Sequence, residues 1–318
     1  MYHKFFTALI YVCLSALTVS VGHVSAQSQT HRQEPMSAVV NPSIPAKVKF
    51  AGKDIDVDRY DMYERLDREL TAMSYTHGNT LLTIKRANRY FPEMIPILKN
   101  EGVPEDLIYL ACIESSLNPR AYSPSKAAGF WQFLAGTAKE YGLEVNDYVD
   151  ERYHPEKSTR AAAKYLKSAY QKYGNWESAA ASYNGGMGRI TRELSEQNVS
   201  SAYDLYLTDE TSRYMFRLLA MKMIMEHPSR YGYVLKPENL YQPMKYTEVE
   251  VNEPVDSWSQ WAMEHGTNYM TLRDFNPWIR AKSLPNKSGK TYMVRVPVKD
   301  SLSHSKNYSK PYNPDWVK

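Results

Sequence analysis

The chain has 318 residues, of which 43% are hydrophobic and 23% charged, as in a soluble globular protein with a sizeable core. Its formal net charge of +4 is small, and the absence of a dense basic run or a recognised nucleic-acid motif argues against a nucleic-acid partner. The eight histidines are scattered and neither HExxH nor CxxC occurs, so we expect no cofactor and no metal site.

Residues 1–26 have the pattern of a secretory signal peptide. Lys4 gives a positive start, Phe5 to Val21 is an apolar stretch, and the segment ends in small residues at Ala26, after which we expect cleavage. A membrane anchor is the alternative, but the segment is short and no second apolar span follows. Cys13 is not preceded by small residues, so no clear lipobox supports lipidation. We therefore expect an exported, periplasmic protein, with outer-membrane association left open.

Two helices are predicted in the first part of the mature chain. Apolar residues recur at helical spacing from Val57 to Tyr75. Asn79 or Thr80 can cap a second helix, which we expect Pro92 and Pro96 to interrupt.

Glu114 ends an apolar run that begins at Ile108, where apolar surroundings make an ionised carboxylate unfavourable. Pro104 suits the first turn of a helix, and we expect this helix to stop before Asn118-Pro119, with Glu114 in its last turn. There the negative end of the helix and the apolar surroundings both oppose ionisation. A carboxylic acid that stays protonated near neutral pH is what a general acid requires. An ordinary solvated glutamate at a helix end is the alternative.

Four more helices are predicted before a change of character near Pro243. Glycine ends the first three of them, and the last has a buried side with Tyr214 and Leu218. They span Thr137 to Tyr141, Pro155 to Tyr173, Trp176 to Tyr183, and a segment that starts at Asp209 or Thr211.

The C-terminal part alternates between strand and helix patterns. Tyr246–Val251 and Tyr292–Val296 alternate like strands, and Ser257–His265 and Tyr269–Phe275 have the pattern of short helices. The expected fold is therefore mainly α, followed by a small α+β unit of β-α-α-β order.

Three segments accompany Glu114 and have side chains suited to a sugar. They are Gly129-Phe130-Trp131-Gln132, Ser182-Tyr183-Asn184 and Glu210 to Tyr214. Gly129 would let the backbone approach a ligand, and amide and phenol groups can bond sugar hydroxyls. For each segment alone, a structural role in a turn, the core or a helix end is favoured.

Together and in this order, these segments resemble the lytic transglycosylases that share the goose-type lysozyme fold, also called the SLT domain. The resemblance rests on Glu114-Ser115, Gly129-Phe130-Trp131-Gln132 and Ser182-Tyr183-Asn184. It is strongest to the membrane-bound lytic transglycosylase D type, through Trp131-Gln132-Phe133, Asp150-Glu151-Arg152, Pro155 to Thr159 and Glu210 to Tyr214.

The resemblance implies a peptidoglycan lytic transglycosylase that acts on glycan strands. Glu114 would protonate the oxygen that leaves C1 of N-acetylmuramic acid, and then take the proton of that sugar's C6 hydroxyl, which closes to a 1,6-anhydro end. Substrate contacts would come from Ser115, Gly129, Gln132, Tyr183, Asn184 and Tyr214, with Tyr214 orienting Glu114. No second carboxylate is obvious, since Glu140 and Glu144 lie in a segment that the family does not use, and this favours internal attack over water activation.

The C-terminal unit resembles a degenerate LysM module, which implies glycan binding, with a purely structural appendage as the alternative. The predicted boundaries are a signal peptide at 1–26, a linker at 27–56, the lysozyme-like domain at 57–230, a linker at 231–243, the LysM-like module at 244–299 and a loose tail at 300–318. A muramidase on the same fold, a non-catalytic wall-binding protein and an enzyme acting mainly on chitin remain alternatives.

Overall fold

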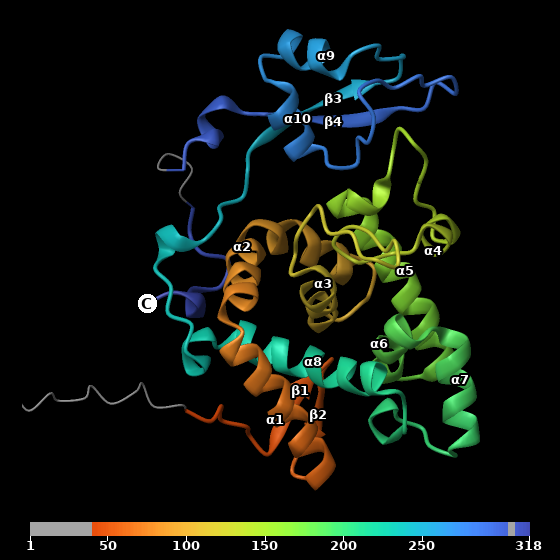
Figure 1. Cartoon of the computed structure of the whole chain (residues 1–318), viewed down its shortest axis with the longest axis vertical. Coiled ribbons are helices and arrows are strands. Elements are labelled where there is room, and N and C mark those ends of the chain that lie inside the picture. The colour runs from red at the N-terminus through yellow and green to blue at the C-terminus, as the bar shows by residue number, and fades with distance from the viewer. Residues whose placement is uncertain (1–39, 305–308) are drawn as a thin grey trace, which may run out of the picture. The chain divides into compact units, whose positions relative to one another are not determined.

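Helices dominate the region up to residue 231 in the computed structural model, which describes residues 40–304 and 309–318 (Figure 1). In chain order they are α1 (Tyr60–Tyr75), α2 (His77–Asn100), α3 (Ile108–Ser115), α4 (Ala135–Glu140), α5 (Pro155–Tyr173), α6 (Trp176–Gly185), α7 (Met187–Glu196) and α8 (Asp209–Glu226). The short 3-10 helices are η1 (Glu105–Leu107), η2 (Glu151–Tyr153), η3 (Ala202–Asp204), η4 (Pro228–Tyr231), η5 (Pro237–Asn239), η6 (Lys299–Leu302) and η7 (Pro314–Trp316). The predicted signal peptide lies outside the described residues. Within them, no helix combines the length and apolar character needed to cross a bilayer.

The α5 and α6 helices begin and end where local sequence signals place them. Pro155 occupies the first turn of α5, and Gly174 ends it in the left-handed conformation with φ of 71°. The side chain of Asn175 then caps α6 by accepting a hydrogen bond from the backbone N–H of Ser178 at 2.8 Å. α7, which follows directly after Gly186, was not predicted.

The α2 helix continues through both of its prolines, so the predicted interruption is wrong. Pro92 and Pro96 each remove one backbone donor, but the helix buries Phe91 and Leu98 at both ends of this stretch. Packing against the core therefore outweighs the lost hydrogen bonds. The helix also begins at His77, slightly before the predicted cap.

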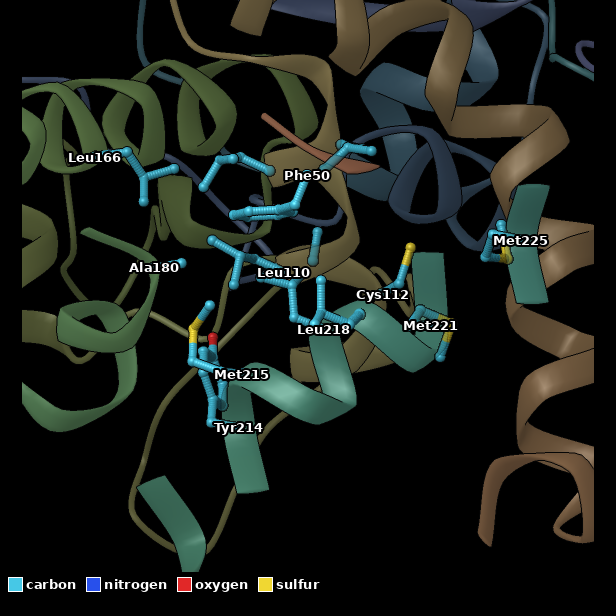
Figure 2. Close-up of a cluster of buried hydrophobic side chains, with 14 of the residues drawn as sticks. Phe50, Leu110, Cys112, Leu166, Ala180, Tyr214, Met215, Leu218, Met221 and Met225 are labelled. Carbon is cyan, nitrogen blue, oxygen red and sulfur yellow. The ribbon is translucent and has the colours of Figure 1, made fainter. Parts of the chain in front are cut away.

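The core of the helical region is built around α8, which contacts α1, α3 and α6. Figure 1 shows α8 passing beneath α3 in this view. Leu110 of α3, Leu166 of α5 and Leu218 of α8 are fully buried in one cluster, and Figure 2 shows them together with Phe50.

Phe50 comes from a hairpin within the predicted linker at 27–56, of which the structure describes residues 40–56. Strands β1 (Lys47–Phe50) and β2 (Lys53–Asp56) pair antiparallel, with Lys47 opposite Asp56. Val48 and Phe50 are buried in the helical core, and the turn is tied to η1 because Asp106 accepts a hydrogen bond from the backbone N–H of Ala51 at 2.7 Å. The alternation in this strand is too short to stand out in the sequence.

The C-terminal unit has the predicted β-α-α-β order. It consists of β3 (Tyr246–Val251), α9 (Trp258–Glu264), α10 (Tyr269–Phe275) and β4 (Tyr292–Pro297), and β3 and β4 pair antiparallel with Tyr246 opposite Pro297. Its core contains Trp258, Leu272 and Val294, together with Val149 from the loop before η2. A residue of the helical region thus completes the core of this unit.

The segment 231–243, predicted as a linker, is packed along α2. Leu235 and Leu240 are buried, and the backbone N–H of Tyr241 donates to the carbonyl of Lys85 at 3.1 Å. The described part of the tail at 300–318 is also anchored. Trp316 is buried and its indole N–H donates to the carbonyl of Met225 at 2.5 Å. The prolines and polar residues of both segments indicated loops, although the apolar side chains between them pack into the core.

Candidate active site

Glu114 lies in the last turn of α3, as predicted. The helix ends because Ser116 and Leu117 both adopt the left-handed conformation, with φ of 51° and 53°. The backbone N–H of Ser116 donates to the carbonyl of Cys112 at 2.9 Å, and Leu117 is fully buried. This fixed chain reversal holds the Glu114 side chain at the edge of the core, where it is half-buried.

The carboxyl group of Glu114 is held by Tyr214 of α8. The phenol hydroxyl of Tyr214 donates to Oε1 of Glu114 at 2.6 Å, as expected for an orienting residue. Burial raises the pKa of Glu114 from 4.5 to about 7, although the hydrogen bond from Tyr214 and the charge of Arg217 both lower it. The carboxyl group is therefore poised to donate and accept a proton near neutral pH.

The charges of Arg217 and Glu210 shift the pKa of Glu114, and the sequence did not predict this influence. The guanidinium of Arg217 lies 6.0 Å from the ring centroid of Tyr214, and its buried Nε has no hydrogen-bond partner among the described residues. The charge of exposed Glu210 raises the pKa of Glu114. The signal was the spacing on α8, since positions 210, 214 and 217 share one helix face.

Ser115 is buried. Its hydroxyl is 2.8 Å from the carbonyl of Phe130 and 3.0 Å from the carbonyl of Ala111. This geometry ties α3 to the turn at 129–132. It suits the predicted hydrogen bond near the acid more than direct contact with a sugar.

Gly129 is required by a close approach of protein backbone, and its expected contact with a ligand stays a prediction. Its φ is +76°, and a Cβ atom there would lie 1.9 Å from the carbonyl oxygen of Arg152. Arg152 is itself buried, forms a bidentate pair with Asp150 at 2.9 and 2.7 Å, and donates to the carbonyls of Lys126 and Phe133. The Asp150–Arg152 pair therefore fixes the loop that holds the turn.

Gln132 is half-buried and adopts the left-handed conformation with φ of 49°. Its side-chain N–H group donates to the carbonyl of Gly129 at 2.8 Å, and the carbonyl of Ala121 is 3.4 Å away. Among the described residues the amide oxygen of Gln132 accepts no hydrogen bond. The amide is thus pre-oriented, with an acceptor available to a sugar hydroxyl or N-acetyl N–H. Its neighbour Trp131 is a core residue that donates its indole N–H to Thr159 at 3.0 Å.

Tyr183 and Asn184 end α6 near the acid. The hydroxyl of Tyr183 donates to the carbonyl of Trp131 at 2.8 Å, and burial together with the charge of Glu114 raises the pKa of Tyr183 well above its usual value. Asn184 is half-buried, and its amide forms no hydrogen bond to any residue that the structure describes. Tyr183 therefore supports the turn and lies within electrostatic reach of Glu114, while Asn184 has free polar groups for a ligand.

Two of the acids considered as a second catalytic carboxylate, Glu144 and Asp150, have structural partners. Glu144 binds Lys290 and accepts a hydrogen bond from Tyr292 at 3.0 Å, and Asp150 is engaged by Arg152. Glu140 is exposed on α4. Over the part of the chain that the structure describes, no group of three or more His, Cys, Asp or Glu side chains is arranged to hold a metal ion.

Comparisons with known proteins relate two parts of the chain to described families. Residues 94–205 match the family described as Transglycosylase SLT domain, and residues 247–300 match the Soluble lytic transglycosylase C-terminal LysM-like domain. Membrane-bound lytic murein transglycosylase D of Escherichia coli (strain K12) is 29% identical over 249 residues, which cover 76% of this chain and 53% of that protein. The chain thus spans about half the length of this relative.

Two soluble enzymes are similar over shorter stretches. Soluble lytic murein transglycosylase of Salmonella typhimurium is 35% identical over 82 residues, which cover 24% of this chain and 13% of that protein. The crystal structure of the 70 kDa soluble lytic transglycosylase of Escherichia coli matches with a TM-score of 0.38 and 21% identity, over 52% of this chain and 34% of that chain. The chain therefore contains a transglycosylase SLT domain followed by the LysM-like C-terminal domain of soluble lytic transglycosylases, and it is homologous to membrane-bound lytic murein transglycosylase D.

Proposed function

We propose that the chain is a peptidoglycan lytic transglycosylase that cleaves the β-1,4 bond between N-acetylmuramic acid and N-acetylglucosamine. The observation that carries the proposal is the Glu114 carboxyl group, whose pKa burial raises to about 7 and which Tyr214 holds at 2.6 Å. Gln132 and Asn184 each have a hydrogen-bonding group without a partner among the described residues, and we propose that they bind the sugar. The homology to murein transglycosylases supports this substrate class.

In the first step, protonated Glu114 donates its proton to the glycosidic oxygen as the bond to C1 of N-acetylmuramic acid breaks. The leaving sugar departs with a free hydroxyl, and Glu114 is left as a carboxylate. The Tyr214 hydrogen bond and the charge of Arg217 stabilise that carboxylate, because both lower the pKa of Glu114. Burial alone would keep the proton on the acid and oppose its transfer.

In the second step, the carboxylate takes the proton of the C6 hydroxyl on the same N-acetylmuramic acid. The C6 oxygen then bonds to C1, which gives a 1,6-anhydro end and returns Glu114 to its protonated form. The two steps consume no water and need no cofactor. A pKa near 7 suits both, since one group must lose and regain a proton at the same pH.

Hydrolysis is the second candidate, and Glu210 is the observation that keeps it open. Glycosidases usually place a second carboxylate near the acid to activate water. Glu210 is the acid whose charge raises the pKa of Glu114. Its position at the exposed start of α8, one turn before Tyr214, suits an electrostatic influence on Glu114.

The remaining parts of the proposal concern organisation and location. We assign catalysis to residues 57–230 and place a glycan-binding module at 244–299, where the LysM-like match supports it. Export through the signal peptide at 1–26 would place the protein in the periplasm, where its glycan-strand substrate lies. Outer-membrane association has no support from a clear lipobox.

The test compares release of soluble fragments from purified peptidoglycan by the wild type, Glu114→Gln and Glu210→Gln. We expect Glu114→Gln to abolish release, because Gln cannot donate a proton to the leaving oxygen. We expect Glu210→Gln to keep most of the release and the same product ends. Equal release by Glu114→Gln and the wild type would refute a catalytic role and favour a wall-binding protein. Loss of release in Glu210→Gln would favour hydrolysis by two carboxylates.

A further inference from the structure

A cavity of about 810 Å³ lies at the junction between the SLT domain and the LysM-like module. One wall comes from the loop after α3 and from the segment around η2, and the other comes from α10 and the residues that follow it. Backbone hydrogen bonds hold the two walls together, since Asp150 donates to the carbonyl of Trp278 and Arg280 donates to the carbonyl of Tyr148, both at 2.8 Å. The cavity is thus built into a fixed junction and has the size of a ligand cleft.

The cavity is lined by four arginines and by a single acidic residue. Two of the arginines are neutralised, because Arg152 pairs with Asp150 and Arg120 pairs with Asp274. Arg273 and Arg280 form no ion pair with any carboxylate among the described residues. Two uncompensated guanidinium groups therefore face one cavity, which favours an anionic ligand.

Arg273 is the clearest indication of a missing partner. Its Nη1 donates to the hydroxyl of Tyr269 at 2.6 Å, and its buried Nε finds no hydrogen-bond partner within residues 40–304 and 309–318. A buried donor without a partner is costly, and a carboxylate bound by the guanidinium would satisfy it. Arg280 stacks 4.3 Å from the ring centroid of Tyr153, and its Nη1 is 3.3 Å from the carbonyl of Pro277, which leaves its other N–H groups for hydrogen bonds.

The cavity adjoins the turn that holds Gln132. The carbonyl of Ala121 accepts a hydrogen bond from the backbone N–H of Gly129 at 2.9 Å and lies 3.4 Å from the side-chain nitrogen of Gln132. Arg120 and Tyr122, the residues on either side of Ala121, line the cavity. A substituent on a sugar held by Gln132 would therefore have this cavity beside it.

We propose that this arginine cavity binds the carboxylate groups of the peptide substituent carried by the glycan strand. The inference rests on the proposed function, because peptidoglycan is the glycan that carries a carboxylate-bearing peptide beside each cleavage site. Arg273 and Arg280 form the charge-assisted hydrogen bonds, and exposed Tyr122 with half-buried Tyr269 gives apolar surface to the peptide. The junction thereby binds the peptide while the SLT domain binds the sugar.

The test measures affinity by calorimetry in the full chain with Glu114→Gln, so that no turnover occurs. The ligands are a N-acetylglucosaminyl-N-acetylmuramyl tetrapeptide and the same molecule with its carboxyl groups amidated. We expect the acid to bind about tenfold or more tightly than the amide, from two charge-assisted hydrogen bonds. The double variant Arg273→Gln/Arg280→Gln is expected to bring this ratio to about 1 and to remove its salt dependence.

Two further variants keep the result unambiguous. Arg273→Gln alone leaves the Arg280–Tyr153 stacking intact, and it is expected to reduce the ratio even if the double variant loosens the junction. Arg230→Gln removes an exposed arginine in η4, which does not line the cavity, and is expected to leave the ratio unchanged. Equal affinity for acid and amide in the parent, or an unchanged ratio in both arginine variants, would overturn the proposal. Because these are binding measurements, they stand apart from the cleavage assay that decides the proposed function.

Discussion

Replacing Glu114 by glutamine is expected to stabilise the fold, and to do so only when the pH is high enough to ionise the wild-type carboxyl group. Burial raises the pKa of Glu114 from 4.5 to about 7. Each pKa unit corresponds to about 1.4 kcal/mol, so the ionised carboxylate costs the folded state about 3 kcal/mol above pH 7. Solvent screening of this half-buried side chain makes that figure an upper value.

The direction of the pH dependence of the unfolding free energy follows from whether the folded or the unfolded chain holds the Glu114 proton. Between pH 4.5 and about 7 the folded protein holds the Glu114 proton while the unfolded chain has released it. The free energy of unfolding contributed by this group is therefore fully present below 4.5 and is lost as the pH rises through about 7. Glutamine has no proton to lose, and its side-chain oxygen can still accept the hydrogen bond from Tyr214.

The assay is urea unfolding of the wild type and Glu114→Gln, followed by circular dichroism at a series of pH values. The difference in unfolding free energy is expected to be near zero around pH 4.5 and to rise with pH toward an upper value of about 3 kcal/mol around pH 8. Glu140→Gln, which alters an exposed glutamate on α4, is the matched control and should parallel the wild type. A difference that does not change with pH, or destabilisation by Glu114→Gln at pH 8, would refute the assignment of a buried, proton-holding carboxyl group.

Three other substitutions test the neighbours of this group. Tyr214→Phe removes the hydrogen bond that lowers the pKa of Glu114, so the high-pH limb of kcat/KM should move up by about 1 to 2 units, and an unmoved limb in a pH–rate profile would contradict this role. Arg217→Gln removes a positive charge that also lowers the pKa of Glu114, so the high-pH limb of kcat/KM for this variant should move up as well. A downward shift of that limb would be inconsistent with the geometry. Gly129→Ala forces a Cβ against the carbonyl of Arg152 and should destabilise the fold by about 3 kcal/mol or more, which a thermal melt near that of the wild type would disprove.

The sequence was sufficient where local signals and packing agree. Pro155 and Gly174 mark the ends of α5, and the alternation at Tyr246–Val251 marks β3, because these signals act within one element. The position of Glu114 in the last turn of α3 was predictable for the same reason. Its partner Tyr214 lies a hundred residues away, and the family resemblance rather than periodicity indicated that contact.

The sequence was insufficient where distant packing decides the outcome. The prolines of α2 predict a break, but the buried residues around them keep the helix continuous. The four residues of β1 carry too short a pattern to predict that Phe50 fills the helical core. No local signal at Gly129 reveals that the backbone of Arg152 approaches it from another segment.

The central claim is that Glu114 transfers a proton to the glycosidic oxygen and then receives one from the C6 hydroxyl of the same sugar. Mass spectrometry of fragments released from purified peptidoglycan tests it most directly, with Glu114→Gln as the inactive comparison. The account predicts N-acetylmuramic acid ends that are lighter by one water than reducing ends, and none above background with the variant. Reducing ends from the wild type, or anhydro ends from Glu114→Gln at the wild-type rate, would contradict it.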